Sequence, residues 1–257
     1  MDAQLFNSKT TLETYRSEVW RAVESQEDAA TLGIVDSLDE QDALEAMLEE
    51  AKPAYRVGTE QMHYLLKTAF RYPPLKYGSR FGTQFMPSYF YASEQFKTAL
   101  CETAYYRFLF LEHMQNAYQA PVRSEYSLFK VTVSSNACLD LTMTKFKKVK
   151  NELADPQSYA RSHQVGKWAM DRVPPAELIC FYSARRTHAK NVAIAEPRVI
   201  RSKQPRGLRS WLCLTTWDVQ NPLNSNVSFR SRESPEVHLF QRRDYCDSEG
   251  RLLMVAS

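Results

Sequence analysis

Arg80, Tyr91 and Glu102 follow one another at equal intervals of eleven residues. The arginine lies in a predicted turn bracketed by Gly78 and Gly82. The tyrosine ends a predicted strand, and the glutamate lies inside an apolar predicted helix, where an unpaired carboxylate would be costly. A cation, an aromatic ring and a carboxylate that converge on one cleft suit a substrate with a diphosphate, a flat base and a ribose.

The segments that must position these residues predict an α+β fold. Residues 89–91 read as a short strand, and Ser93 is the expected cap of a long helix at residues 94–114. Asp155-Pro156 is expected to open a second helix that ends near residue 170. Further strands are predicted at residues 128–133, 139–143, 177–182, 191–195, 211–215 and 237–241. Because nothing alternates as regular strand–helix–strand units, we expect a curved mixed or antiparallel sheet with flanking helices.

The N-terminal region predicts two helices. Apolar residues recur at helical spacing over residues 11–31. Ser37 and Glu40 form an S-x-x-E capping box for the second helix, and Pro53 ends it. We expect this helical pair to pack on the body of the protein or to serve in homo-oligomerisation.

Charge separates the same region from the rest of the chain. The first 50 residues hold 13 acidic and 3 basic side chains, a net charge of −10, and the other 207 hold 17 and 30, a net charge of +13. The two parts either attract each other and aid solubility, or the basic body receives an anionic ligand. We therefore divide the chain into an acidic helical extension at residues 1–55 and a main domain at 56–257, with its core at about 62–200.

Several kinds of site have no signature in this sequence. Seven glycines form neither GxGxxG nor GxxxxGK[ST], no serine has a GxSxG surround, and five isolated histidines lack metal-ligand spacing. Five widely spaced cysteines without a CxxC pair predict reduced, mostly buried thiols. The N-terminus lacks the order of a signal peptide, and no apolar run approaches the ~20 residues that cross a bilayer. We expect a soluble, cytoplasmic protein without a metal, a membrane contact or direct nucleic-acid binding.

Two more residues could reach the same cleft. Arg71 precedes the extended segment YPP and could contact an anion from the side opposite Arg80. Ser183 ends the apolar strand LICFY and could hydrogen-bond a ligand. Taken singly, each candidate also has an ordinary interpretation: a surface arginine, a core aromatic, a paired surface acid, or a serine that caps a strand.

Five short motifs occur in order along the chain: FRYPP with Arg71, GSRFG with Arg80, FYAS with Tyr91, TALCE with Glu102 and FYSAR with Ser183. Together they resemble the RES family of bacterial toxins, which consume NAD. HQVG, which holds Gly166, also looks like a family feature, and the N-terminal segment EQDALEAMLEEAKP resembles the extension of a longer RES subgroup. Two positions depart from the pattern. Tyr182 replaces the usual proline before the serine. The first arginine of the family pattern could be Arg56 in YRVG or Arg71 in FRYPP, and we assign it to Arg71 because FRYPP leads directly into GSRFG.

The resemblance implies a fold related to ADP-ribosyltransferase toxins and cleavage of the nicotinamide–ribose bond of NAD, which is a substrate and not a resident cofactor. It implies that Glu102 stabilises an oxocarbenium-like ribose while Tyr91 stacks on nicotinamide. Arg71 and Arg80 would clamp the diphosphate, and Ser183 would orient the carboxamide or a phosphate. The expected ligand contacts are Arg71, Tyr72, Arg80, Tyr91, Ser183 and Asn191, with Arg56 as a weaker candidate.

The acceptor and the partner stay open at this point. Water would make the protein a glycohydrolase, inorganic phosphate a phosphorylase, and a protein side chain an ADP-ribosyltransferase. The sequence has no Glu-x-Glu pair, which mildly favours NAD depletion. The competing class is a non-enzymatic module that binds a nucleotide or a protein. The resemblance also implies a cognate Xre-type helix-turn-helix antitoxin, with an immunity protein for a secreted effector as the alternative.

Overall fold

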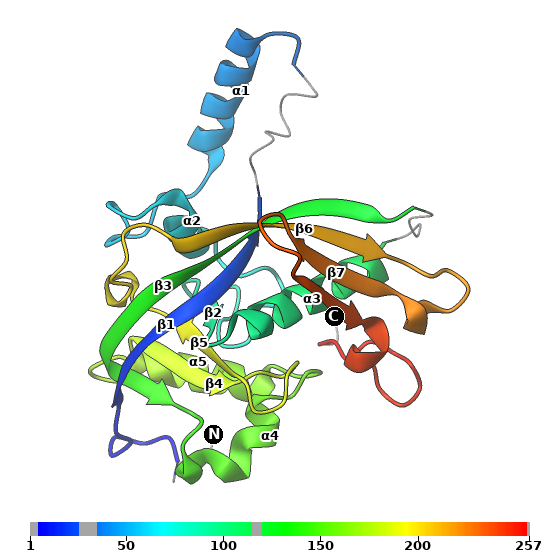
Figure 1. Ribbon diagram of the computed structural model, residues 1–257. Coiled ribbons are helices and arrows are strands. Elements are labelled where there is room, and N and C mark those ends of the chain that lie inside the picture. Colours follow the sequence, from blue (N-terminus) through cyan, green and yellow to red (C-terminus); the bar gives the residue numbers. More distant parts are fainter. Residues whose placement is uncertain (1–4, 26–34, 115–119, 256–257) are drawn as a thin grey trace.

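A computed structural model describes residues 5–25, 35–114 and 120–255 and has a mixed α+β architecture (Figure 1). The strands are β1 (Glu13–Glu24), β2 (Phe90–Ser93), β3 (Val122–Asp140), β4 (Leu178–Tyr182), β5 (Lys190–Ile194), β6 (Arg206–Thr216), β7 (Asn226–Ser231) and β8 (Val237–Gln241). The helices are α1 (Leu38–Ala51), α2 (Tyr64–Lys67), α3 (Phe96–Glu112), α4 (Lys150–Leu153) and α5 (Ala160–Asp171). The predicted α+β class is confirmed. Its relation to ADP-ribosyltransferases stays a prediction.

One mixed sheet joins all of these strands. Its order is β1-β2-β5-β4-β3-β6-β7-β8. Strand β1 also pairs with β3, so the strands β1, β2, β5, β4 and β3 form a closed ring of pairings. Only the pairing of β3 with β4 is parallel among the described strands. The long β3 replaces the two separate strands predicted at residues 128–133 and 139–143. It is one continuous strand that pairs with β6 in its first half, with β1 over most of its length and with β4 at its end. No strand is predicted at β7, which extends the sheet beyond β6.

The predicted helix at residues 11–31 is wrong, because Glu13–Glu24 forms strand β1 in an antiparallel ladder with β3. Tyr15, Val19 and Val23 pack on one apolar core. A spacing of four residues places side chains on one face of a helix and also on one face of a strand. The spacing alone therefore does not distinguish a helix from a strand, and the segment forms a strand because it pairs with β3. Residues 26–31 of the prediction lie outside the described residues.

Two predicted helix starts are also wrong. Ser93 lies in β2 and donates from Oγ to Asn191 Oδ1 at 2.7 Å, so α3 begins after Gln95, which makes no side-chain cap. The helix predicted to open at Asp155-Pro156 begins later, as α5. The Asp155 carboxylate instead accepts a hydrogen bond from the Gln157 N–H at 2.8 Å in a local turn.

Helix α1 is confirmed with its cap. The Ser37 side chain accepts a hydrogen bond from the Glu40 N–H at 3.2 Å, and the helix ends shortly before Pro53. No residue of α1 is buried, and the helix projects from the rest of the fold (Figure 1). The predicted domain boundary after residue 55 stays a prediction. The predicted helical character of residues 1–55 is wrong at β1, which is a strand of the central sheet.

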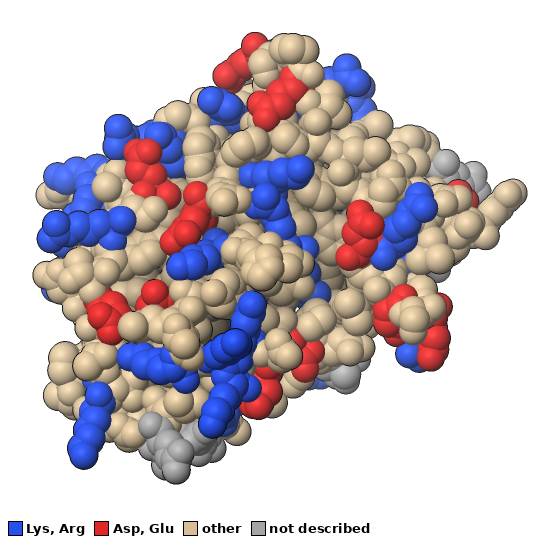
Figure 2. Space-filling view, turned by 60° about the horizontal axis from the view of Figure 1, so that its bottom comes forward, with Lys and Arg blue, Asp and Glu red and all other residues tan. Residues whose placement is uncertain are grey.

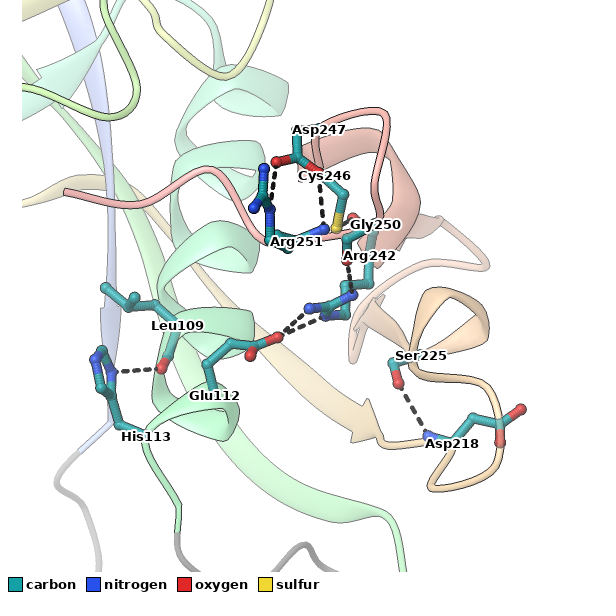
Figure 3. A network of polar contacts seen from close by, with 10 residues as sticks. All are labelled: Leu109, Glu112, His113, Asp218, Ser225, Arg242, Cys246, Asp247, Gly250 and Arg251. Carbon is teal, nitrogen blue, oxygen red and sulfur yellow. Dashed lines mark hydrogen bonds and ion pairs between the residues drawn. The ribbon is translucent and has the colours of Figure 1, made fainter. Parts of the chain in front are cut away.

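Helix α3 lies across the sheet and is buried over most of its length (Figure 1). At its C-terminal end, Glu112 Oε1 accepts a hydrogen bond from Arg242 Nε at 2.9 Å, and Arg242 Nη1 donates to the Gly250 carbonyl at 3.1 Å (Figure 3). The side chain of Arg242 is only 5% exposed. The segment after β8 therefore fixes one end of the helix that carries Glu102.

The remaining composition-based expectations concern thiols and surface charge. All five cysteines are free and only Cys246 is not fully buried, which confirms the prediction of mostly buried thiols. None of the described helices is long and apolar enough to cross a membrane. On the face shown in Figure 2, Lys and Arg side chains are interspersed with Asp and Glu.

Candidate active site

A cleft of roughly 310 Å³ opens between α3 and the strands β1, β2, β4 and β5. Its walls are completed by the turn before β2 and by the loop before α5. The residues that line it are Trp20, Arg21, Ala22, Ser79, Arg80, Tyr91, Ala92, Ser93, Ala99, Glu102, Thr103, Tyr106, Tyr159, Phe181, Arg185 and Asn191. A larger hollow of roughly 610 Å³, between the N-terminal segment and α5, contains none of the predicted catalytic residues.

Glu102 is held in the cleft by neighbouring side chains. Its Oε1 accepts a hydrogen bond from Ser183 Oγ at 2.6 Å and another from Asn191 Nδ2 at 2.7 Å. Asn191 is itself oriented by Ser93, and the Ser183 hydroxyl accepts from the N–H groups of Arg185 and Arg186 at 3.0 Å. The amide and hydroxyl donors fix one carboxylate oxygen, and no described residue donates to Oε2. The second oxygen is therefore left for a ligand.

The predicted turn around Arg80 is confirmed and is closed by glycine. Gly78 has φ of +74°, which favours glycine, and the Ser79 N–H donates to the Gly82 carbonyl at 2.7 Å. Arg80 Nη1 donates to the carbonyls of Leu153 and Asp155, both at 3.0 Å. These contacts hold the guanidinium at the cleft through Nη1 alone. The other two guanidinium nitrogens can therefore donate hydrogen bonds to an anion.

The hydroxyl of Tyr91 ties β2 to the arginine turn. It accepts a hydrogen bond from the Phe81 N–H at 3.1 Å and donates to Ser79 Oγ at 2.9 Å. The ring packs edge-on against Phe181 with centroids 6.4 Å apart, and both residues line the cleft. Burial raises the pKa of Tyr91 to about 12. The phenol is therefore neutral at physiological pH and acts as a fixed hydrogen-bonding group.

Replacing Tyr91 by Phe should lower the free energy of unfolding by about 2 kcal/mol, because the buried Phe81 N–H loses its partner. Urea denaturation measures this loss. Because the pKa is raised, the phenol contributes fully below about pH 10, and its contribution is lost as the pH rises toward 12. Tyr77, whose side chain is exposed, provides the matched control, and Tyr77→Phe should change stability by less than about 0.5 kcal/mol. A Tyr91→Phe protein as stable as the wild type would show that the phenol does not hold the turn.

The cleft has an excess of positive charge. Arg21, Arg80 and Arg185 line it, and none of them forms an ion pair with a carboxylate of the described residues. Arginines buried elsewhere in the described chain have carboxylate partners, namely Glu49 for Arg71, Glu24 for Arg107 and Glu112 for Arg242. Glu102 is the one acidic residue among those that line the cleft. The arrangement favours an anionic ligand.

The structure does not place every predicted residue at the cleft. Arg71 points to α1, where Nη1 pairs with Glu49 at 2.7 Å and Nε donates to the Pro53 carbonyl at 2.6 Å. Tyr72 is half exposed and does not line the cleft, and Arg56 donates to the Ser88 carbonyl at 3.2 Å. The expected clamp of one anion between Arg71 and Arg80 is therefore not formed, because Arg71 is already neutralised by Glu49.

Sequence reasoning missed other residues of the cleft. Tyr159 stacks on Arg80, with the guanidinium carbon 4.9 Å from the ring centroid. Arg185, which lies 3.4 Å from the ring centroid of Tyr105, is the last residue of the FYSAR motif, a signal that could have been used. Arg21 gave no signal, because it lies in the segment predicted to be helical. Among the described residues, no group of three His, Cys, Asp or Glu side chains could hold a metal ion.

Comparison with known families agrees with the motifs of the sequence. A family model described as RES domain matches residues 53–217, more than half of the chain, and the chain belongs to this family. The resemblance drawn from the motifs is confirmed. No curated protein matches the sequence. Among solved structures, a chain of the M. tuberculosis MbcT-MbcA toxin-antitoxin complex is 15% identical with a TM-score of 0.44, and the alignment covers 78% of this chain and 85% of that one.

Proposed function

We propose that this protein is a RES-type toxin that cleaves the nicotinamide–ribose bond of NAD and depletes it. The observation that carries the proposal is the setting of Glu102. It is the single acidic residue among those lining a cleft with three arginines, with one oxygen fixed by two donors and the other free of described partners. Membership in the RES family supports the same activity.

In the proposed reaction, the bond between ribose carbon 1 and the nicotinamide nitrogen breaks, and its electron pair leaves with neutral nicotinamide. The ribose becomes an oxocarbenium-like cation. A carboxylate fixed beside that cation before the bond breaks stabilises the charge without reorganisation at the moment of reaction. Glu102 has this role, and an acceptor with a lone pair then adds to the ribose carbon and loses a proton.

The other residues bind and position. Arg80 contacts the diphosphate with the donors that the loop carbonyls leave free. The ring of Tyr91 packs against the nicotinamide beside Phe181. Ser183 and Asn191 act through Glu102, because both donate to its carboxylate, so they are positioning residues in this proposal.

Product analysis tests the proposal and identifies the acceptor. The purified full-length protein is incubated with NAD, with and without inorganic phosphate, and the products are resolved by mass. ADP-ribose together with nicotinamide indicates a hydrolase, and a phosphorylated ADP-ribose that forms only with phosphate indicates a phosphorylase. ADP-ribose attached to protein indicates a transferase. Folded protein that releases no nicotinamide under any of these conditions would overturn the proposal.

The proposal includes a partner. The RES resemblance supports a cognate helix-turn-helix antitoxin of Xre type, which would protect the producing cell by covering the cleft or by holding the toxin in an inactive assembly. An immunity protein would serve the same purpose if the toxin were delivered to other cells. In either case, the partner must stop NAD from reaching Glu102.

A further inference from the structure

Helix α5 meets the arginine turn along one face. Tyr159, the residue before the helix, is followed by His163 and Gly166 at spacings of four and three residues, so the three lie on the same side of α5. Tyr159 stacks on the Arg80 guanidinium in the cleft. One helical turn further on, His163 Nε2 lies 2.7 Å from the Ser79 carbonyl oxygen. This face of α5 therefore contacts both the backbone and the charged group of the arginine turn.

The hydrogen bond of His163 has only one possible direction. A carbonyl oxygen only accepts hydrogen bonds, so the proton lies on Nε2 and the imidazole donates to Ser79. The Ser79 hydroxyl accepts a hydrogen bond from Tyr91, and the Ser79 N–H donates to the Gly82 carbonyl. His163 is not among the residues that line the cleft. It therefore holds the residue next to Arg80 from outside the cleft.

Two glycines allow the helix and the turn to approach each other this closely. A Cβ added at Gly78 would lie 3.0 Å from His163 Nε2, so the absence of a side chain in the turn leaves room for the imidazole. A Cβ added at Gly166 would lie 1.9 Å from the Phe81 carbonyl oxygen, so the helix in turn leaves room for the backbone of the turn. A directional hydrogen bond between two segments packed at this distance fixes their relative position.

The contacts of His163 lead to the arginine and not to the carboxylate of the site. Glu102 takes its hydrogen bonds from Ser183 and Asn191, neither of which lies on α5. The Arg80 guanidinium is held at its tip by carbonyls of the loop before α5, and the imidazole holds the backbone from which the side chain extends. A change at His163 should therefore displace Arg80 and leave Glu102 in place.

We propose that His163 is a positioning residue, which donates from Nε2 to the Ser79 carbonyl and thereby holds Arg80 where the diphosphate of NAD binds. This inference rests on the proposed function, since it takes Arg80 as the contact of the diphosphate. Substrate affinity then depends on an imidazole that does not touch the substrate. Because the diphosphate is not changed by the reaction, loss of this support weakens binding and leaves the breakage of the bond in the bound substrate unaffected.

Two substitutions in the full-length protein separate the hydrogen bond from the packing. His163→Gln keeps an amide donor near the position of Nε2, whereas His163→Met fills similar space with a flexible side chain that has no donor. Lys167→Ala is the control, because Lys167 lies one turn further along α5 and its side chain is 72% exposed. Calorimetry measures binding of ADP-ribose, which has the diphosphate, and of nicotinamide, which does not. Steady-state kinetics of nicotinamide release give kcat and KM, and thermal unfolding checks that each variant is folded.

We expect His163→Met to weaken ADP-ribose binding and to raise the KM for NAD roughly 5- to 10-fold, which corresponds to the loss of about one hydrogen bond. Its kcat and its affinity for nicotinamide should stay within about twofold of the wild type. His163→Gln should bind ADP-ribose within about threefold of the wild type, because the donor is restored. Lys167→Ala should match the wild type in all of these measurements.

Three results would overturn the inference. In the first, folded His163→Met binds ADP-ribose as tightly as the wild type. In the second, His163→Gln binds it as weakly as His163→Met, so that the donor is not the reason for the loss. In the third, kcat falls and KM does not change. Should His163→Met not fold, His163→Gln decides alone, since a loss of ADP-ribose affinity beyond about threefold in the folded protein would contradict the role of the donor.

Failure of the inference and failure of the proposed function give different results. If the wild type releases nicotinamide from NAD and His163→Met binds ADP-ribose as tightly as the wild type, the inference is wrong and the proposed function stands. If His163→Met weakens ADP-ribose binding but the wild type releases no nicotinamide, the proposed function is wrong, and His163 remains a positioning residue of a nucleotide site. A wild type that binds no ADP-ribose would overturn the inference, whatever its activity.

Discussion

Replacing Glu102 by Gln is expected to lower the rate of nicotinamide release from NAD by about 100- to 1,000-fold or more. The amide has nearly the same shape, and its carbonyl oxygen can still accept hydrogen bonds from Ser183 and Asn191. The negative charge that stabilises the cationic ribose is lost. The loss should therefore appear in kcat, with little change in the affinity for ADP-ribose, and steady-state kinetics with calorimetry measures both.

The control for this variant is Glu249→Gln. Glu249 pairs with Arg251 at the surface, at 3.0 Å, and both side chains are about two-thirds exposed or more. It should keep wild-type kinetics. Both variants should unfold within about 1 kcal/mol of the wild type, because neither leaves a buried group without a partner. A folded Glu102→Gln protein that retains most of its activity would remove Glu102 from the reaction.

Replacing Gly166 by Ala is expected to lower the free energy of unfolding by about 3 kcal/mol. In an ordinary helix interior, this change stabilises by about 1 kcal/mol. Here an added Cβ would lie 1.9 Å from the Phe81 carbonyl oxygen and 2.8 Å from its carbonyl carbon, which are backbone atoms that cannot move aside alone. Because Phe81 follows Arg80, the shift should displace the arginine turn, so ADP-ribose affinity should fall together with stability.

Chemical denaturation measures the stability of Gly166→Ala, and Lys167→Ala is the control on the next residue of α5. The Lys167 side chain is 72% exposed and forms a surface ion pair with Asp171, so its removal should cost less than about 0.5 kcal/mol. If Gly166→Ala proved as stable as the wild type, the close approach of α5 to the arginine turn would not exist in solution.

The parts of the site that the sequence predicts are those governed by local contacts. The capping box at Ser37 and Glu40 defines α1, and the glycines around Arg80 define its turn. The apolar run around Glu102 gives α3, because it forms a buried helix whatever its exact cap. In each case the residues that determine the local structure are neighbours in the chain, so their pattern can be read directly.

The missed parts depend on contacts between distant segments. β1 is a strand because β3 provides a ladder for it, and the spacing of its apolar residues fits a helix equally well. That error hid Arg21, which lines the cleft. Arg71 was assigned to the cleft because it precedes the arginine turn in the sequence, whereas Glu49 of α1 holds it elsewhere. An ion pair across 22 positions of the chain has no signature in sequence spacing.

The measurement that tests the central proposal most directly is nicotinamide release from NAD by the purified full-length protein, followed over time beside Glu102→Gln. We predict that the wild type releases many molecules of nicotinamide for each molecule of protein, and that Glu102→Gln releases almost none while it remains folded. Wild-type protein that binds ADP-ribose but leaves NAD intact, in the presence and absence of phosphate, would contradict the proposal. The cleft would then belong to a nucleotide-binding module and not to an enzyme.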